Sequence, residues 1–258
     1  RDGSSDVCSS DLAKDIALAI LSRWTVEGAE YRAIEFAGDA IADIPLDDLP
    51  VIPNMMAEFG AMSAYIAPSS AVLDYVSARA KRAFTPLYPD IGATYSETVT
   101  VDVSALEPLV ACPHQPDNVR AVSALYGTPI HQAFIGTCTG GRYSDLAAAA
   151  DVVRGKQLKA RLIVIPASAQ VLSQALETGV LGTLVAAGAA IGTPGCGPCM
   201  GNHMGVPASA ESTISTGSRN FKGRMGTTDA PVYLANAAVV AASAVAGAIV
   251  SPSEIEAP

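Results

Sequence analysis

Three cysteines in two short glycine-containing segments are the residues of this sequence most able to do chemistry. Cys138 lies in Gly-Thr-Cys-Thr-Gly-Gly-Arg at 136–142, and Cys196 and Cys199 lie in Pro-Gly-Cys-Gly-Pro-Cys at 194–199. Three thiolates can hold an iron–sulfur cluster and leave one iron open to a substrate hydroxyl and carboxylate, whereas four thiolates close the cluster and suit electron transfer. The count of three therefore favours a cluster that acts on a substrate.

Other interpretations of these cysteines remain open. Cys-Gly-Pro-Cys is also the active-site sequence of thioredoxin-like oxidoreductases, which usually carry an aromatic residue before it rather than Pro-Gly. His203 could join Cys138, Cys196 and Cys199 in a tetrahedral Cys3His zinc site. The three cysteines could also be small buried hydrophobic residues, although their predicted loops contain glycine and proline. We prefer the cluster and keep a non-catalytic, zinc-stabilised binding domain as the alternative.

A second candidate site is the basic segment 215–226, which is rich in glycine and serine and contains Arg219 and Arg224. A guanidinium group binds a carboxylate through two parallel hydrogen bonds, which lysine cannot do. On its own such a segment is more often a solvated charged loop, so this interpretation depends on the cysteines. With them, the two arginines become candidates for binding a dicarboxylic acid, and we include the adjacent Ser218 among the substrate-binding candidates.

Composition and charge restrict the class of protein. The chain has 258 residues, of which 50% are hydrophobic, 5% aromatic and 16% charged, as expected of a globular α/β protein. A net charge of −9 argues against a nucleic-acid partner. Five cysteines without an evident secretory signal favour a reducing compartment, so we expect the cytoplasm. The most hydrophobic stretch, 235–250, is short for a bilayer, and we expect a core helix there and no membrane partner.

Hydrophobic patterns along the chain predict alternating helices and strands. In the first half we expect a helix, a strand, two helices and a strand, at 13–24, 31–36, 50–61, 71–83 and 96–103. In the second half we expect strands at 130–135 and 161–165 and helices at 143–154 and 169–177. Short, apolar, β-branched strands predict a parallel sheet covered on both faces, which binds ligands at the carboxyl ends of its strands. Cys138 follows one such strand, and Cys196 follows the apolar segment 185–191.

The domain organisation is expected to have three segments. Residues 1–12 look foreign, because they resemble the translation of a common sequencing adapter joined to ordinary protein sequence at Ala13. The proline-containing segment 107–117 is the expected interdomain connection. We therefore predict a first α/β domain at 13–108 and a second, carrying the cysteines, at 109–258.

Four motifs together resemble the aconitase superfamily, and within it the large subunits of 3-isopropylmalate dehydratase, homoaconitase and dimethylmalate dehydratase. They are Asn-Met-Met-Ala-Glu at 54–58, Gly-Thr-Cys-Thr at 136–139, Cys-Gly-Pro-Cys-Met-Gly-Asn-His-Met-Gly at 196–205 and Ser-Arg-Asn-Phe-Lys-Gly-Arg at 218–224. The resemblance runs from about Ala13 to the C-terminus. It implies aconitase-like three-layer αβα domains with mostly parallel sheets, without the family's N-terminal domain.

The resemblance also implies a cofactor and catalytic residues. It implies a [4Fe-4S] cluster held by Cys138, Cys196 and Cys199, whose fourth iron takes the substrate hydroxyl and a carboxylate. Asn54 and Glu58, four residues apart on one predicted helix face, match family positions that face the cluster and the hydroxyl. Both are therefore catalytic candidates, and Glu58 would help to handle the leaving water.

The implied reaction is a reversible elimination of water from a hydroxy dicarboxylic acid, with Arg219 and Arg224 matching the family's carboxylate binders. The expected substrate is 2-isopropylmalate, converted to 3-isopropylmalate in leucine biosynthesis, with dimethylmalate, citramalate and homoaconitate as alternatives within the family. The chain departs from the family pattern at Gly140 and Ser218, where the family usually has asparagine. The family's catalytic serine belongs to a separate small subunit and its N-terminal motifs have no counterpart here, so we expect this chain alone to be inactive.

Overall fold

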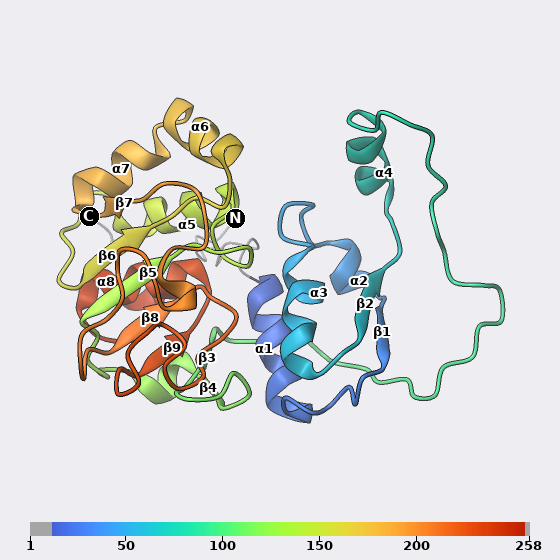
Figure 1. Cartoon of the computed structure of the whole chain (residues 1–258), viewed down its shortest axis with the longest axis horizontal. Helices are drawn as coiled ribbons and strands as arrows, with labels where there is room; N and C mark the ends of the chain where they lie inside the picture. The colour runs from blue at the N-terminus through green and yellow to red at the C-terminus, as the bar shows by residue number, and fades with distance from the viewer. Residues whose placement is uncertain (1–11, 256–258) are drawn as a thin grey trace, which may run out of the picture.

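The computed structural model describes residues 12–255 of the chain. Figure 1 shows a larger body built around a sheet and, beside it, a smaller part formed by the first helices and strands. The smaller part runs from α1 (Leu12–Trp24) to α4 (Ser70–Ser77), and the larger part begins with β3 (Leu109–Ala111). The segments that contain the cysteines and the arginines lie in the larger part, and α1 contacts this part from the smaller one.

Helix α1 joins the two parts of the molecule. Its apolar residues recur at helical spacing, and Leu18 and Leu21 are fully buried. The helix packs on α3 (Val51–Met55) and on the strands β3 and β4 (Val119–Ala121) of the large sheet. The helix predicted over 13–24 is therefore confirmed, and its buried face spans both parts of the molecule.

The smaller part contains a two-stranded parallel sheet. Its strands are β1 (Ala33–Phe36) and β2 (Ser63–Ile66), and the second was not predicted. Between them lie three short helical elements: α2 (Asp39–Ala42), α3 and the 3₁₀-helix η2 (Met56–Phe59). The single helix predicted over 50–61 is thus divided, because the chain tightens at Met56. It ends at Gly60, whose φ of 76° glycine adopts at little cost.

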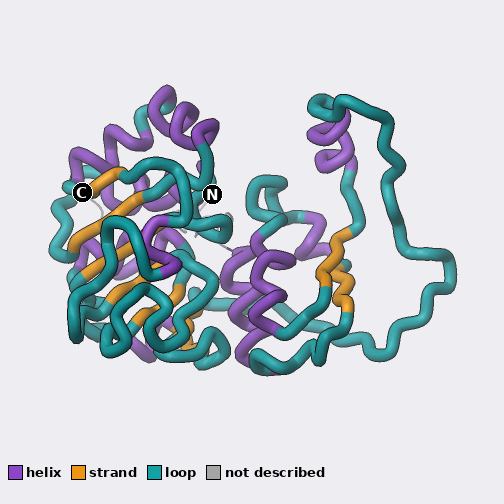
Figure 2. The backbone as a smooth tube through the Cα atoms, viewed as in Figure 1, coloured by secondary structure: helices purple, strands orange, loops and turns teal. Residues whose placement is uncertain are grey.

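A long segment without helix or strand follows the smaller part. It separates α4 from β3 and extends away from the body of the molecule (Figures 1 and 2). The strand predicted over 96–103 is wrong, because the structure pairs no other strand with these residues and most of them are exposed. Alternating valine and threonine suit a strand, but a strand also needs a partner for its backbone hydrogen bonds.

The large sheet has seven strands in the order β4-β3-β9-β8-β5-β6-β7. The strands not yet located are β5 (Gln132–Ile135), β6 (Arg161–Val164), β7 (Ala190–Ile191), β8 (Thr213–Ser215) and β9 (Val232–Leu234). These five are mutually parallel, whereas β3 runs antiparallel to both of its neighbours. The segment predicted as a connection, 107–117, contributes β3 to this sheet. A mixed α/β fold with a mostly parallel sheet is confirmed.

Helices cover one face of the large sheet. They are α5 (Tyr143–Val153), α6 (Ala169–Glu177), α7 (Val180–Ala187) and α8 (Ala237–Ala246), close to the helices predicted for 143–154, 169–177 and the hydrophobic stretch 235–250. Alternate residues of β5 separate the two faces: Ala133 and Ile135 pack with these helices, and Phe134 packs with the cluster that contains α1 and α3. No helix in the described part of the chain is long and apolar enough to cross a membrane.

Candidate functional site

The candidate site lies where the strand order of the large sheet reverses. From β5 the chain continues to β6 and β7 on one side, whereas β8 and β9 lie on the other side. In open parallel sheets, ligands bind in the crevice at the carboxyl ends of the strands beside such a reversal. The Cys138 loop follows β5, the Cys196 segment follows β7, and the arginine segment follows β8. All three predicted site segments therefore leave the same edge of the sheet.

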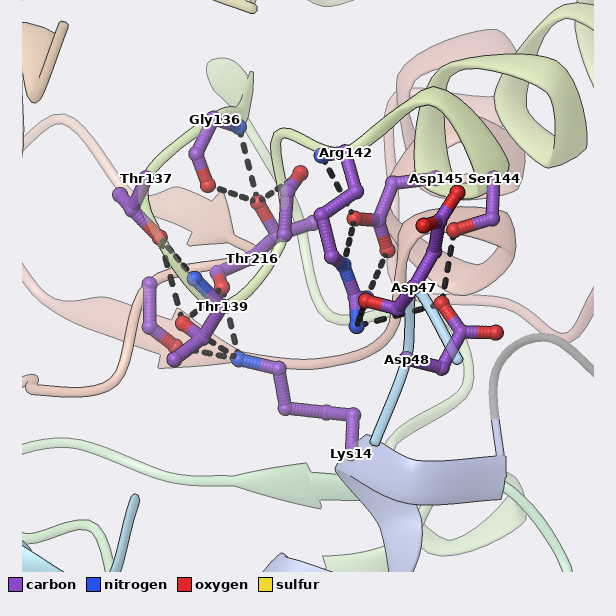
Figure 3. Close-up of polar contacts among 12 residues, drawn as sticks. Lys14, Asp47, Asp48, Gly136, Thr137, Thr139, Arg142, Ser144, Asp145 and Thr216 are labelled. Atoms are coloured by element: carbon purple, nitrogen blue, oxygen red, sulfur yellow. Dashed lines mark hydrogen bonds and ion pairs between the residues drawn. The ribbon is translucent and has the colours of Figure 1, made fainter. Parts of the chain in front are cut away.

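The loop after β5 is buried except at one residue. From Gly136 to Gly141 only Cys138 is exposed. The hydroxyl of Thr216, in the neighbouring loop, accepts a hydrogen bond from the Gly136 amide at 2.9 Å, and it lies 2.9 and 3.1 Å from the carbonyl oxygens of Gly136 and Gly140 (Figure 3). These contacts hold the backbone of the Cys138 loop and leave its thiol facing outward.

Gly140 lies against Thr216 so closely that no side chain fits. A Cβ atom at Gly140 would lie 2.2 Å from Cβ and 2.4 Å from Oγ1 of Thr216. This contact gives a physical reason for the departure from the family pattern at Gly140. Thr216 fills the space that an asparagine side chain would need.

Cys196 and Cys199 lie at the start and within the 3₁₀-helix η4 (Gly197–Met200). Cys196 is exposed and Cys199 is partly buried. Burial, together with the neighbouring Cys196 thiol, raises the pKa of Cys199 to about 11, while the Arg224 guanidinium acts in the opposite direction. Cys112, Cys138, Cys196 and Cys199 are all free of disulfides. The CxxC pair is thus a pair of adjacent thiols that a metal must deprotonate on binding.

The arrangement of donor groups distinguishes a cluster from a single ion. Among residues 12–255, no three His, Cys, Asp or Glu side chains lie close enough together to hold one metal ion. This geometry disfavours the Cys3His zinc site with His203, since four ligands bonded at about 2 Å to one ion must lie within about 4 Å of each other. In a cubane each cysteine binds a different iron, so the sulfurs stand farther apart. Three free thiols on two loops of one sheet edge suit a cluster by their chemistry.

The arginine segment lies beside the cysteines. Arg219 and Arg224 line a small cavity of about 10 Å³ together with Cys199, Ser215, Gly217, Ser218 and Met225. The Nε atom of Arg224 is buried without a hydrogen-bond partner among the described residues, whereas Nε of Arg219 donates to Oε1 of Glu58. The buried Asn220 side chain donates to the carbonyl oxygens of Cys112 and Val232 at 2.7 and 3.2 Å. The segment is therefore fixed by Asn220 and presents both guanidinium groups near Cys199.

Asn54 and Glu58, which we predicted to share one helix face, differ in burial. Glu58 is 7% exposed and paired with Arg219, whereas Asn54 is exposed on α3. The expectation rested on a continuous α-helix, in which residues four apart lie one above the other. Between the two residues, at Met56, the chain changes to a 3₁₀-helix with three residues per turn. Glu58 therefore lies against Arg219, and the catalytic role of Asn54 stays a prediction.

Sequence reasoning missed Lys14, which the structure places at the strand-order reversal. This residue of α1 is 3% exposed, and its Nζ lies 2.7 Å from the Thr216 carbonyl oxygen, 2.8 Å from that of Gly217 and 3.2 Å from Oγ1 of Thr139 (Figure 3). Burial lowers the pKa of Lys14 to about 7, and the Asp145 carboxylate opposes this shift. The sequence pattern makes Lys14 a polar flank of an amphipathic helix, so nothing local indicates its burial.

A second set of polar contacts, which the sequence also did not predict, connects the smaller part of the molecule to α5. The Arg142 guanidinium donates to both carboxylate oxygens of Asp145 at 2.7 Å, and it lies 3.2 Å from Oδ1 of Asp48. Asp48 is 1% exposed and accepts a hydrogen bond from the Ser144 hydroxyl at 2.7 Å. Burial raises the pKa of Asp48. These contacts fix the start of α5, directly after the Cys138 loop (Figure 3).

Comparison with known proteins defines the class to which this fold and site belong. The model of the aconitase (aconitate hydratase) family matches residues 9–129 and 123–247. The chain belongs to the aconitase family.

The relatives are named either homoaconitase large subunits or 3-isopropylmalate dehydratase large subunits. The chain is 47% identical over 247 residues to the homoaconitase large subunit of Thermus thermophilus, and 45% identical over 244 residues to the 3-isopropylmalate dehydratase large subunit of Halothermothrix orenii. It is 43% identical over 243 residues to a probable methanogen homoaconitase large subunit of Methanosarcina mazei. These matches cover 94–95% of this chain and 58–62% of the relatives. The chain thus spans about three fifths of their length.

Proposed function

We propose that this chain is the part of a hydro-lyase large subunit that holds a [4Fe-4S] cluster and the carboxylates of a hydroxy dicarboxylic acid. One observation carries the proposal: Cys138, Cys199 and the two arginines leave the same edge of the sheet, beside the reversal of strand order. The names of the relatives support this reaction class. We propose 2-isopropylmalate as the substrate, with homoaconitate as the main alternative.

The proposed roles follow from the chemistry of the side chains. When bound, a cluster held by three thiolates supplies an iron with a free position, which acts as a Lewis acid. Arg219 and Arg224 bind carboxylates of the substrate through paired, charge-assisted hydrogen bonds. Glu58 holds Arg219 before substrate binds. A substrate carboxylate that binds Arg219 in place of Glu58 would leave the Glu58 carboxylate free to accept a proton or to interact with the leaving water.

The proposal includes a partner and a compartment. The relatives are named large subunits, so we propose that a small subunit, carrying the catalytic serine, completes the site. The free cysteines support a reducing compartment, for which we propose the cytoplasm. We propose no nucleic-acid or membrane partner, in keeping with the net charge of −9.

Anaerobic reconstitution of the whole chain with iron and sulfide tests the cluster. We expect close to four iron and four sulfide per chain and a brown chromophore, because three free thiols are available at one edge of the sheet. Cys138→Ser should reduce the iron content severalfold, whereas the matched control Cys112→Ala should bind as much iron as the wild type. One colourless zinc per chain, with no uptake of sulfide, would instead support the zinc-stabilised domain.

A further inference from the structure

Lys14 connects the two loops that carry the candidate cluster ligand and the candidate carboxylate-binding arginine. It belongs to α1, yet its ammonium group contacts Thr139, next to Cys138, and the backbone of Thr216 and Gly217, two residues before Arg219. These contacts join residues separated by 125 to 203 positions in the sequence.

The contact geometry matches what an ammonium group requires. A lysine side chain has three donors and no acceptor, and Lys14 has three oxygen acceptors within 3.2 Å. The Thr139 hydroxyl also donates to the Thr216 carbonyl at 3.2 Å, so the same oxygen atoms join the two loops to each other. Buried carbonyl oxygens at a strand end need such partners, because water does not reach them.

We propose that Lys14 is a positioning residue that fixes the Cys138 loop against the loop of Arg219. It keeps the thiol and the guanidinium in one relative placement before either a cluster or a substrate is present. This inference rests on the proposed function, which assigns cluster binding to one loop and carboxylate binding to the other. The positioning itself is a property of the metal-free chain. Lys14 touches no reacting atom and acts through Thr139, Thr216 and Gly217.

Hydrogen exchange of the metal-free chain tests the positioning directly. Lys14→Met keeps the length and apolar stem but removes all three donors, so amides of 136–141 and 216–217 should exchange at least about tenfold faster. Asp15→Asn is the matched control. Asp15 is the next residue on α1 and is also buried, but its carboxylate accepts from the Leu109 amide and the Asn236 side chain, away from both loops. It should leave exchange in these two segments unchanged relative to the rest of the sheet.

Iron retention gives a second measurement. In the reconstituted chain, Lys14→Met should lose iron to a chelator at least about tenfold faster than the wild type, and Lys14→Arg, which keeps charge and donors, should fall between them. If Lys14→Met does not fold, Lys14→Gln, which keeps two donors, takes its place. Unchanged exchange in both segments would overturn the proposal. A wild-type chain that takes up no iron would refute the proposed function, while faster exchange in Lys14→Met would still support the positioning role.

Discussion

Gly140 and Thr216 share one small volume beside Cys138, and this contact shows how single residues set the site. The Thr216 hydroxyl bonds the Cys138 loop at Gly136, and its methyl-bearing Cβ excludes a side chain at Gly140. Of the two positions that depart from the expected family pattern, Gly140 contacts Thr216 and Ser218 follows it by two residues in the sequence. The Thr216 side chain, from the next loop, occupies the space that an amide side chain at Gly140 would need.

Replacing Gly140 by asparagine should therefore destabilise this protein. Gly140→Asn places a Cβ atom 2.2 Å from Thr216, so the loop must shift, and we expect a loss of about 1–3 kcal/mol of stability, the usual cost of overpacking. Thermal or denaturant unfolding measures it. Gly127→Asn is the control, because Gly127 has φ of 81° with open space around its Cβ position, and asparagine tolerates that conformation. Equal stability of the two variants would show that the Cys138 loop yields easily.

The candidate residues differ in how far the sequence could reveal them. Cys138, Cys196, Cys199 and the arginines are conspicuous because their residue types and neighbours are unusual for loops. Lys14 is not, since its acceptors lie up to 203 positions away and only the folded sheet brings them together. Glu58 was predicted as a site residue, but its pairing with Arg219, 161 positions away, is a tertiary contact that the local pattern does not indicate.

At the scale of elements, strands with a strong local pattern were predictable and very short ones were not. The strands β5 and β6 are apolar runs followed by helices, and both were expected at nearly their observed bounds. Strands of two or three residues such as β8 and β9 have no readable period. β8 is placed by pairing with β5, and β9 is placed by pairing with β8, which are tertiary contacts.

The stability of the contact between α1 and the large sheet should depend on pH, because Asp15 is buried there. Burial raises the pKa of Asp15 to about 7, against the hydrogen bonds from Leu109 and Asn236. The folded chain then holds a proton between about pH 4 and pH 7 that the unfolded chain has released. The free energy of unfolding should therefore fall as the pH rises through this range.

Asp15→Asn isolates this contribution, because the amide does not titrate. Denaturant unfolding at several pH values from 4 to 7 should give a smaller decrease in stability for the variant than for the wild type. The comparison is made between the two proteins at each pH, so other carboxylates cancel. Parallel pH profiles would mean that Asp15 has an ordinary pKa in the folded chain.

At the scale of the whole molecule, we propose that the site described here is one part of a larger active site. The chain spans about three fifths of the length of its relatives, which are named large subunits. The groups that the family resemblance places on an N-terminal domain and on a small subunit are expected to complete the surroundings of Glu58 and the arginines.

Turnover should accordingly depend on more than this chain. We expect no measurable hydration of unsaturated dicarboxylates by the reconstituted chain alone, even if it holds a full cluster. The assay is run with and without a cognate small subunit, and with a full-length large subunit as the positive control. Robust turnover by the chain alone would place the catalytic base within it, with Glu58 as the first candidate.

The contacts of Lys14 also have a consequence for the order of the folding steps during synthesis. Lys14 is synthesised before its acceptor Gly217, which follows 203 residues later. At a translation rate of about 5–20 residues per second, Gly217 is synthesised about 10–40 seconds after Lys14. During that time the buried face of α1 can pack on the smaller part and on β3 and β4, which are synthesised before Gly217. The final closure of the site must therefore be a late step of folding, made after translation has passed β8.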